Sequence, residues 1–386
     1  MGCFSHRPRG IRLSLQQKLA YILTLRYDPN GPTTIPKLSW SDFVEYPEMG
    51  VAIEPLLHST LRKIIRNRNR IGMGISGGVD TSTVLALTRH IYPNLTIHTY
   101  CVTFGNDMRE SKEANHIADI YGTTHETVVI ENPFERLEKQ VKILGEPRWN
   151  LYTEYLVQKA SQDKCDLLLT GDAGDELFGG YAFRYDQILK SAMLTPIDYL
   201  NAHKNDWVPN QTDLIPQLSW DEIYTYLNLS LTTPLRPLGQ VFLADFNGKL
   251  LHDFLPTTNA FSRYYKVPVE SPFLQPEIIY TASHLPDRLK YDPVNRIGKL
   301  LLRSILLQHS GLQVATREKV GWGMDLAWQW DNHIREMCKD KLGKIPFKTL
   351  GLNPGWLPAG YEKADEHDLR YICKMLGLLA IGFWLK

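Results

Sequence analysis

A turn between residues 76 and 82 has the composition of a phosphate-binding loop. Its sequence, Ser-Gly-Gly-Val-Asp-Thr-Ser, follows a short apolar segment that we expect to form a buried strand, and a helical segment rich in Ala, Leu and Thr comes next. Such a turn leaves unpaired backbone N–H groups at a helix start, where anions bind. Gly77 and Gly78 let the backbone approach a phosphate chain closely, and the hydroxyl groups add further donors.

Asp80 is the unexpected residue of this turn. Bound phosphates repel a carboxylate unless a cation lies between them, so we interpret Asp80 as a magnesium ligand that bridges to a nucleotide. The alternative is an ordinary strand-to-helix turn, in which the aspartate only caps the helix.

A second turn, residues 170–176, gathers carboxylates in the sequence Thr-Gly-Asp-Ala-Gly-Asp-Glu. It follows Leu167–Leu169 directly, and this apolar run indicates another buried strand. Asp172, Asp175 and Glu176 repel one another, so a site that holds them favours bound cations or substrate amines. The alternative is a solvated acidic loop, but such loops seldom come at once after a fully apolar strand.

The two turns together resemble the synthetase domain of the asparagine synthetase family, which belongs to the PP-loop class of ATP pyrophosphatases. The family's phosphate loop is SGGxDS, and residues 76–81 of this chain are SGGVDT. The second family motif is SGEGxDExFGGY, and residues 170–181 are TGDAGDELFGGY. The first motif alone marks enzymes that split ATP between the α and β phosphates, whereas both motifs in this order are specific.

The resemblance implies a fold and a set of ligands. The fold is α/β, a parallel sheet flanked by helices as in adenine nucleotide alpha hydrolase-like proteins, with a mostly helical C-terminal part. The implied ligands are ATP and Mg²⁺, with Asp80 and Asp175 as the metal ligands. The residues implied to bind ATP are Ser76, Gly77, Gly78, Val79, Asp80, Thr81, Val102, Thr103, Thr170 and Gly171.

Two residues are implied to take part in catalysis. Residues 316–324, with the sequence TREKVGWGM, resemble the family segment R-x-K-x-G-F, whose lysine corresponds to Lys319. Attack on the α phosphate builds negative charge on its nonbridging oxygens, which an ammonium group can stabilise. A lone lysine without this context is usually only solvated. Asp172 stands where synthetases have a glutamate, as an amine contact or a general base with a side chain one carbon shorter.

Three further residues are predicted substrate contacts, although structural packing explains them equally well: Glu176, Tyr181 and Arg184. Asp253 and Glu270 are weaker candidates for the same pocket. The segment Ser271–Leu274 resembles part of the family run S-L-E-x-R-x-P-F-L. Pro268 and Glu270, however, replace the glutamate and the arginine of that run. The sequence therefore departs from the family where substrate is recognised, and this departure argues against aspartate as the substrate.

The implied reaction is ATP-dependent amide formation. A substrate carboxylate attacks the α phosphorus, pyrophosphate leaves, and ammonia or an amine displaces AMP from the acyl adenylate. An alternative is a tRNA- or nucleobase-modifying adenylating enzyme of the same class, which would need a basic surface. Residues 61–70 are the one basic run in the sequence, and a solvated helix face also explains this run. A noncatalytic nucleotide-binding protein is the third hypothesis, and the presence of Asp80, Asp175 and Lys319 together argues against it.

The N-terminal region bears on the source of nitrogen. Glutamine-hydrolysing synthetases begin with a cysteine nucleophile after Met1, whereas this chain has Gly2 there, and the phosphate loop begins at residue 76. We therefore expect that the glutaminase domain is missing. The expected partners are a small-molecule or peptide carboxylate and an amine donor, which is free ammonia, an amine on the acceptor, or ammonia from a separate amidase subunit. A homodimer is also compatible with the resemblance.

The segment between the two turns alternates in the βαβ manner, which requires a parallel sheet with ligands beyond the carboxyl ends of its strands. The expected strands are residues 95–104 and 125–130, and the expected helices are 13–25, 61–70, 111–121, 134–143, 152–162 and 375–385. After about residue 190 prolines are frequent and the strand signal ends. We therefore expect a helical lead-in over 1–60, an α/β core over 61–190 and a helical region over 191–386.

Composition limits the remaining possibilities. The chain has 386 residues, of which 43% are hydrophobic, and a formal net charge of +1, so bulk electrostatics does not favour nucleic acid. Its five cysteines are scattered without zinc or CxxC spacing, which favours a reduced cytoplasmic setting. The apolar run near the C-terminus is too short to span a bilayer, so we expect no membrane association.

Overall fold

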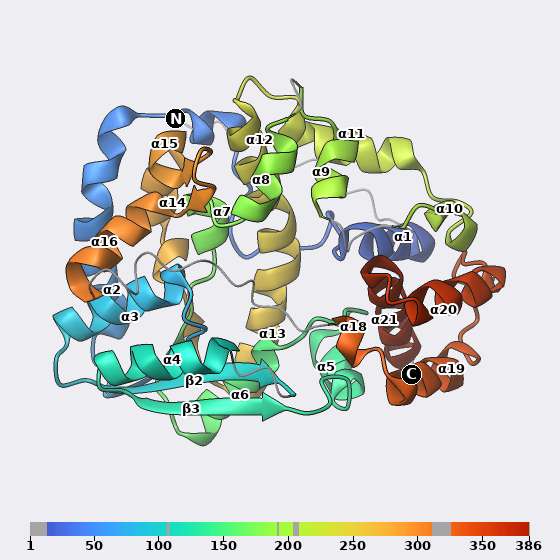
Figure 1. Cartoon of the computed structure of the whole chain (residues 1–386), viewed down its shortest axis with the longest axis horizontal. Coiled ribbons are helices and arrows are strands. Elements are labelled where there is room, and N and C mark those ends of the chain that lie inside the picture. Colours follow the sequence, from blue (N-terminus) through green and yellow to red (C-terminus); the bar gives the residue numbers. More distant parts are fainter. Residues whose placement is uncertain (1–13, 106–108, 191–192, 204–207, 311–325, 386) are drawn as a thin grey trace, which may run out of the picture.

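The computed structural model describes residues 14–105, 109–190, 193–203, 208–310 and 326–385. The α/β part contains a five-stranded sheet with the strand order β3-β2-β1-β4-β5, in which every neighbouring pair is parallel. Figure 1 shows β2 and β3 of this sheet side by side. The strands are β1 Arg70–Gly74, β2 Thr96–Phe104, β3 Thr124–Ile130, β4 Leu167–Leu169 and β5 Val269–Glu270. The predicted parallel α/β fold is therefore confirmed.

The predicted end of strand structure near residue 190 was wrong. β5 comes from the C-terminal half of the chain and pairs with β4, with Val269 opposite Leu168 and Glu270 opposite Leu169. Two residues are too few to show an alternating pattern, and Pro268 precedes them, so periodicity could not reveal this strand. The short antiparallel pair β6 Tyr291–Asp292 and β7 Ile297–Gly298 was missed for the same reason.

The helices of the α/β part agree closely with the sequence pattern. Four of them lie between the strands: α3 Val79–Ile91, α4 Arg109–Ile120, α5 Leu137–Leu144 and α6 Thr153–Gln162. The helix α2 Ile53–Ile65, which precedes β1, ends earlier than expected. Asn67 adopts a left-handed backbone conformation, and the Asp166 carboxylate accepts hydrogen bonds from the backbone N–H groups of Asn69 and Arg70. The basic run over 61–70 is thus only half helical.

The remainder of the described chain is mostly helical. Its α-helices are α1 Leu15–Leu25, α7 Gly174–Phe178, α8 Ala182–Ile188, α9 Pro196–Ala202, α10 Gln211–Leu214, α11 Trp220–Leu231, α12 Pro237–Asp245, α13 Leu255–Tyr265, α14 Pro276–Ser283, α15 Asp287–Lys290, α16 Leu300–Ser310, α18 Leu326–Gln329, α19 Asn332–Leu342, α20 Leu357–Asp365 and α21 Leu369–Trp384. A π-helical segment, η3 Phe246–Phe254, joins α12 to α13.

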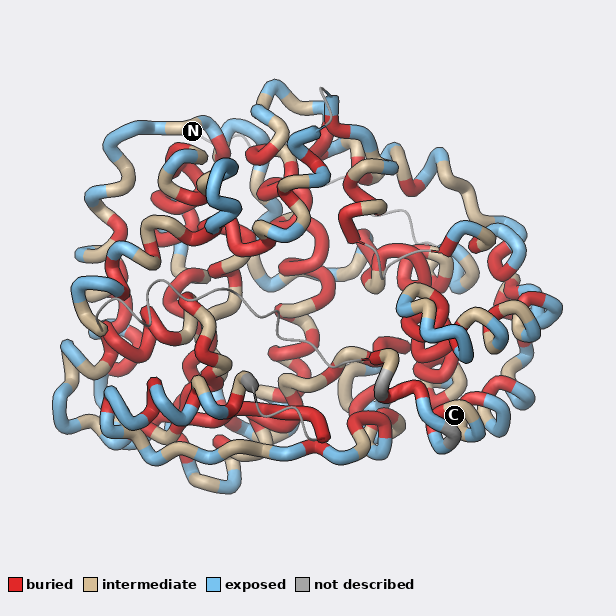
Figure 2. Tube along the Cα trace, in the orientation of Figure 1, coloured by how far each residue is buried: buried red, intermediate tan, exposed pale blue. Residues whose placement is uncertain are grey.

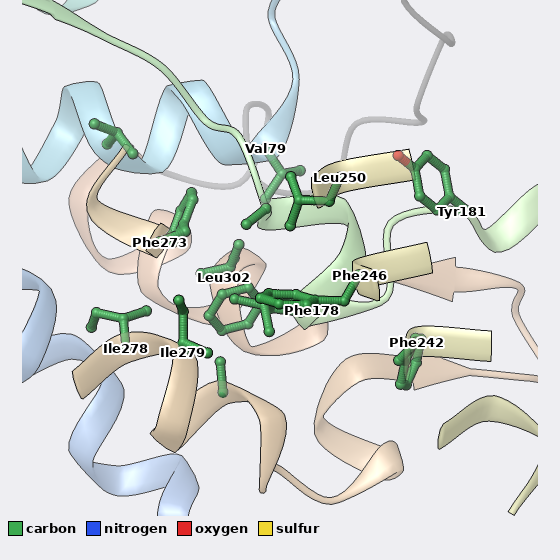
Figure 3. Packing of buried hydrophobic residues seen from close by; sticks show 14 of the residues in the cluster. Val79, Phe178, Tyr181, Phe242, Phe246, Leu250, Phe273, Ile278, Ile279 and Leu302 are labelled. Atoms are coloured by element: carbon green, nitrogen blue, oxygen red, sulfur yellow. The ribbon is translucent and has the colours of Figure 1, made fainter. Parts of the chain in front are cut away.

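One hydrophobic core packs α3, α7 and α16 against one another. Figure 3 shows Phe178 of α7 packed among aromatic side chains, and its ring lies edge-on to that of Phe273 at 5.4 Å between centroids. Val79 of α3 and Leu302 of α16 belong to the same buried cluster. Truncating a buried phenylalanine to alanine costs about 3–5 kcal/mol. The start of α3, the end of α7 and the start of α16 are therefore held together by apolar packing.

A second core surrounds the terminal helix. The predicted helix at the C-terminus is confirmed as α21, which is buried along most of its length, whereas α19 and α20 beside it carry many exposed residues (Figure 2). Among the described helices, none combines the length and the apolar character that crossing a membrane demands. The four described cysteines, Cys101, Cys165, Cys338 and Cys373, are buried and form no disulfide.

Candidate active site

The first predicted turn leads from β1 into α3. β1 ends at Gly74, Gly77 has a φ of 74°, and Gly78 is the N-terminal cap of the helix. The positive φ explains a glycine at residue 77, because other residues are strained in this conformation. Asp80 therefore lies in the first turn of α3, among backbone N–H groups that the helix itself does not pair.

The second turn leads from β4 into α7 and lies beside the first. β1 and β4 are adjacent and parallel, with Met73 opposite Leu169, so both turns leave the same edge of the sheet. Within the turn the Thr170 hydroxyl donates to the Asp172 carboxylate at 3.0 Å. The Ser271 hydroxyl donates to the Asp172 carbonyl at 2.7 Å. The turn is thereby tied to the segment after β5.

Two glycines of the second turn allow it to pack directly on Asp80. A Cβ atom at Gly171 would lie 2.9 Å from the Asp80 Cβ, and one at Gly174 would lie 2.5 Å from the Asp80 Oδ1. Both distances are shorter than real side chains tolerate. The two turns therefore interlock, and only glycine fits at these positions without displacing the carboxylate.

A buried lysine bridges the two turns. The Lys299 ammonium forms ion pairs with Asp80 and with Asp175, the latter at 2.6 Å between Nζ and Oδ1. Burial alone would lower the pKa of Lys299, but the Asp175 and Asp80 carboxylates outweigh it and raise the pKa. The lysine side chain is only 5% exposed and is charged.

The backbone around Lys299 explains its position. Lys299 follows β7, has a left-handed φ of 60°, and donates its backbone N–H to the Phe178 carbonyl of α7 at 3.1 Å. One turn further along α16, Arg303 lies close enough to Asp80 for the carboxylate to oppose the lowering of the Arg303 pKa by burial. Two cationic side chains, Lys299 directly before α16 and Arg303 within it, thus lie near Asp80.

A comparison with known families covers most of the chain. Residues 52–380 match the family model described as asparagine synthase. The chain belongs to the asparagine synthase family. A putative glutamine-hydrolysing asparagine synthetase of Mycobacterium bovis is 27% identical, over 95% of this chain and 60% of its own length. Putative asparagine synthetase 2 of Methanocaldococcus jannaschii is 30% identical, over 35% of this chain and 28% of its own.

The chain thus spans about 60% of the mycobacterial relative and less of the archaeal one. Among solved structures, the U34-tRNA thiolase NcsA of Methanococcus maripaludis is similar over 72% of this chain and 85% of that chain, at 16% identity. Its TM-score is 0.27, a likeness too low to support an argument.

In this asparagine synthase family member, burial sets the protonation of the other carboxyl groups of the second turn. Burial, followed by the charges of Asp175 and Asp80, raises the pKa of Asp172 against the hydrogen bond from Thr170. Burial and the charge of Asp175 raise the pKa of Glu176 to about 8. Glu176 is therefore mostly protonated at pH 7.

Tyr181 and Arg184 lie next to Glu176. The Tyr181 hydroxyl donates to Glu176 Oε1 at 2.6 Å, and the Arg184 guanidinium stacks on the Tyr181 ring at 4.1 Å from its centroid. Arg184 also lies 3.7 Å from the buried carboxylate of Asp245. Glu176, Tyr181 and Arg184, three of the predicted substrate contacts, are thus connected to one another by direct contacts.

The other two predicted substrate contacts lie in different surroundings. Asp253, in the π-helical segment, is 1% exposed, and Arg148 donates to its carboxylate at 3.2 Å. This buried ion pair explains Asp253 as part of the core. Glu270 ends β5 and accepts a hydrogen bond from the Thr170 backbone through its carbonyl at 3.0 Å, so it adjoins the second turn.

The predicted adenine neighbours Val102 and Thr103 are buried near the end of β2, which pairs with β1. Lys319 lies outside the described residues. The roles of Asp80 and Asp175 as magnesium ligands stay predictions, as do the other assigned roles. Sequence reasoning missed Lys299, and its one signal was a lysine directly after a glycine at a helix start.

Proposed function

We propose that this chain is an ATP-dependent carbon–nitrogen ligase that activates a carboxylate as an acyl adenylate and forms an amide. The observation that carries the proposal is the convergence of Asp80 and Asp175 on one cation, the Lys299 ammonium, at the edge of the sheet. Because both carboxylates contact the same ammonium group, they are placed to share a positive charge. The family membership of residues 52–380 supports the same reaction class.

The start of α3 is the proposed ATP site. Backbone N–H groups after Gly77 would bind the phosphates, and the hydroxyl groups of Ser76 and Thr81 would add donors. The two carboxylates fit magnesium, which prefers one or two carboxylates together with phosphate oxygens. Magnesium would neutralise the charge of the leaving pyrophosphate. Lys299 would place an ammonium group beside the same oxygens.

The proposed first step joins the carboxylate to the nucleotide. One carboxylate oxygen forms a bond to the α phosphorus, and the bond from that phosphorus to the oxygen bridging to the β phosphate breaks. The electron pair of the broken bond leaves with pyrophosphate. Holding the carboxylate in line with the α phosphate supplies much of the rate, and Lys319 would stabilise the charge on the nonbridging oxygens.

The proposed second step is attack of an amine on the acyl carbon. A nitrogen–carbon bond forms, the carbon–oxygen bond to AMP breaks, and the amine loses a proton. Asp172 is the candidate acceptor of this proton, because it stands where the family has a glutamate and its carboxylate is held in the second turn by a hydrogen bond from Thr170. Glu176 is mostly protonated at pH 7, so we assign it to positioning rather than to proton transfer.

The substrate class we propose is a small-molecule or peptide carboxylate, with ammonia or an amine as the nitrogen donor. Pro268 and Glu270 stand where the family has a glutamate and an arginine, so we expect aspartate to be a poor substrate. The four buried cysteines without disulfides support a reducing cytoplasm as its location.

The nucleic-acid alternative is less favoured because of where the basic run lies. The Arg68 side chain donates to the Asp166 carbonyl, and the Arg70 side chain donates to the Asp163 carbonyl at 3.0 Å. These residues lie at the start of β1, opposite the end that leads to Ser76. Arg68 and Arg70 therefore stabilise the turn before β4 and lie at the end of β1 away from the proposed ATP site.

The proposal is tested by pyrophosphate release from ATP and magnesium against a panel of small carboxylates and peptides, with and without ammonium. We expect pyrophosphate and AMP in equal amounts with a subset of the panel. We also expect loss of activity in Asp175→Asn and full activity in Asp340→Asn, whose carboxylate is exposed on α19. Release of phosphate and ADP would contradict the proposal, and release only with tRNA would favour the alternative.

A further inference from the structure

A cluster of histidines lies far from the acidic turns. Glu54 and His58 of α2, His90 of α3 and His309 of α16 meet where these three helices pack together, on the left in Figure 1. The four residues are separated by up to 255 positions in the sequence. Only the packing of the three helices brings them together.

The distances suit a shared ligand. His309 Nε2 lies 2.9 Å from Glu54 Oε1, and His58 Nε2 lies 3.9 Å from the same oxygen. One ligand atom from each of these residues falls within 4.8 Å of the others. Ligands about 2.0–2.2 Å from a tetrahedral zinc ion are separated by about 3.3–3.6 Å, so small side-chain adjustments suffice.

A buried ring nitrogen gives a second, independent indication. The Nε2 atom of His58 is buried and has no hydrogen-bond partner among the described residues. A buried polar atom without a partner costs free energy, and native structures seldom retain one. The nitrogen faces Glu54, and a metal ion between the two side chains would satisfy it.

His90 can complete the site. Its ring centroid lies 5.0 Å from that of His309 and 5.7 Å from that of His58, and its side chain is exposed, so rotation can bring a nitrogen inward. His90 and His309 lie in the last turns of their helices, where the dipole favours a cation, and Glu54 lies in a first turn, where it favours a carboxylate.

We propose that Glu54, His58 and His309, with His90 as a fourth ligand, form a binding site for a divalent transition metal of the zinc class. Imidazole and carboxylate ligands together select zinc and its neighbours over magnesium. The ligands come from three helices, so the ion would clamp α2, α3 and α16 at one point. The site is structural, because a fourth protein ligand leaves no open coordination position for substrate.

Two helices, α3 and α16, connect the proposed metal site to the acidic turns. α3 begins beside Asp80 and ends beside His90, and α16 begins after Lys299 and ends beside His309. Helices of this length are about 16–20 Å long, so the ion would hold the far ends of the two helices whose near ends carry Asp80 and Lys299.

The test uses the whole chain, freed of any affinity tag, in excess magnesium so that the acidic turns are saturated. Zinc titration by calorimetry and metal content after dialysis are measured for the wild type, His58→Ala and His309→Ala. The matched control is His116→Ala, an exposed histidine of α4. We expect about one tightly bound zinc ion in the wild type and the control, with a raised Tm, and neither effect in the two variants.

A conservative variant distinguishes the loss of a metal ligand from misfolding. Glu54→Gln keeps the size of the side chain and should weaken zinc binding at least about tenfold, the loss typical even for residues behind the ligands. Its folding is checked by circular dichroism without zinc. Unchanged zinc affinity in His58→Ala, His309→Ala and Glu54→Gln would overturn the proposal, as would a wild-type chain that binds no zinc.

Discussion

The ammonium group of Lys299 lies 2.6 Å from the carboxylate of Asp175 and joins it to Asp80, across two turns that are far apart in the sequence. The lysine is buried and the two carboxylates are partly buried, and the three charged groups come from the starts of three different elements. Its removal therefore tests both the stability of the fold and the proposed chemistry.

Lys299→Met should leave the partly buried carboxylates of Asp80 and Asp175 facing each other without their shared cation. Breaking a fully buried ion pair by removing one partner costs about 3–5 kcal/mol. Water partly solvates these two carboxylates, so the free energy of unfolding should fall by less than that amount in chemical denaturation. Because magnesium can replace the missing charge, added magnesium should raise the Tm of the variant more than that of the wild type. Pyrophosphate release should fall in the variant.

The control for this experiment is Lys339→Met on α19, which removes an exposed ion pair with Glu336. Exposed pairs contribute about 0–1 kcal/mol, so its stability should hardly change. Equal magnesium effects on the Tm of Lys299→Met and of the wild type would argue against a shared cation site.

Glu176 should make stability depend on pH. Its pKa is raised from 4.5 to about 8 in the folded chain, so its contribution is complete below about pH 4.5 and is lost as the pH rises through about 8. Glu176→Gln cannot ionise, and the difference in unfolding free energy between variant and wild type should shift in favour of the variant across this range.

The measurement is denaturant unfolding at several pH values from 5 to about 9, with Glu362→Gln, exposed on α20, as the control. The control should follow the wild type. A constant difference between Glu176→Gln and the wild type would show that Glu176 ionises normally in the folded chain.

Gly174→Ala should disturb the site through a single methyl group. The new Cβ would lie 2.5 Å from the Asp80 carboxylate and would displace it from the cation, so magnesium-dependent ATP binding should weaken markedly. Gly382→Ala is the matched control, because its Cβ would meet nothing closer than 3.4 Å. Wild-type ATP affinity in Gly174→Ala would show that ATP binding does not depend on the position of the Asp80 carboxylate.

Much of the α/β part could be predicted because β1, β2 and β4 carry apolar residues that stand out in the sequence, whereas the two-residue strand β5 could not. Once β1 and β4 are parallel neighbours, the convergence of Asp80 and Asp175 at one edge follows. The ion pair to Lys299 could not be predicted, because it spans 219 residues and depends on tertiary packing. The early end of α2 depends on the left-handed Asn67 and on hydrogen bonds to Asp166, which periodicity does not register.

The predicted substrate contacts lie in two kinds of surroundings. Glu176, Tyr181 and Arg184 come together because they follow one another along α7 and α8. Asp253 instead satisfies Arg148 in the core, since a buried arginine needs a carboxylate partner. Charge and position in the sequence do not distinguish a buried structural ion pair from a substrate contact.

The most direct test of the central claim is calorimetric titration of ATP with magnesium into the wild type, Asp80→Asn, Asp175→Asn and Asp340→Asn. If the two acidic turns share one metal-bound nucleotide, the wild type and Asp340→Asn should bind ATP in a magnesium-dependent manner, and each of the other two variants should lose this dependence. Magnesium-dependent ATP binding that survives in both Asp80→Asn and Asp175→Asn would contradict the account.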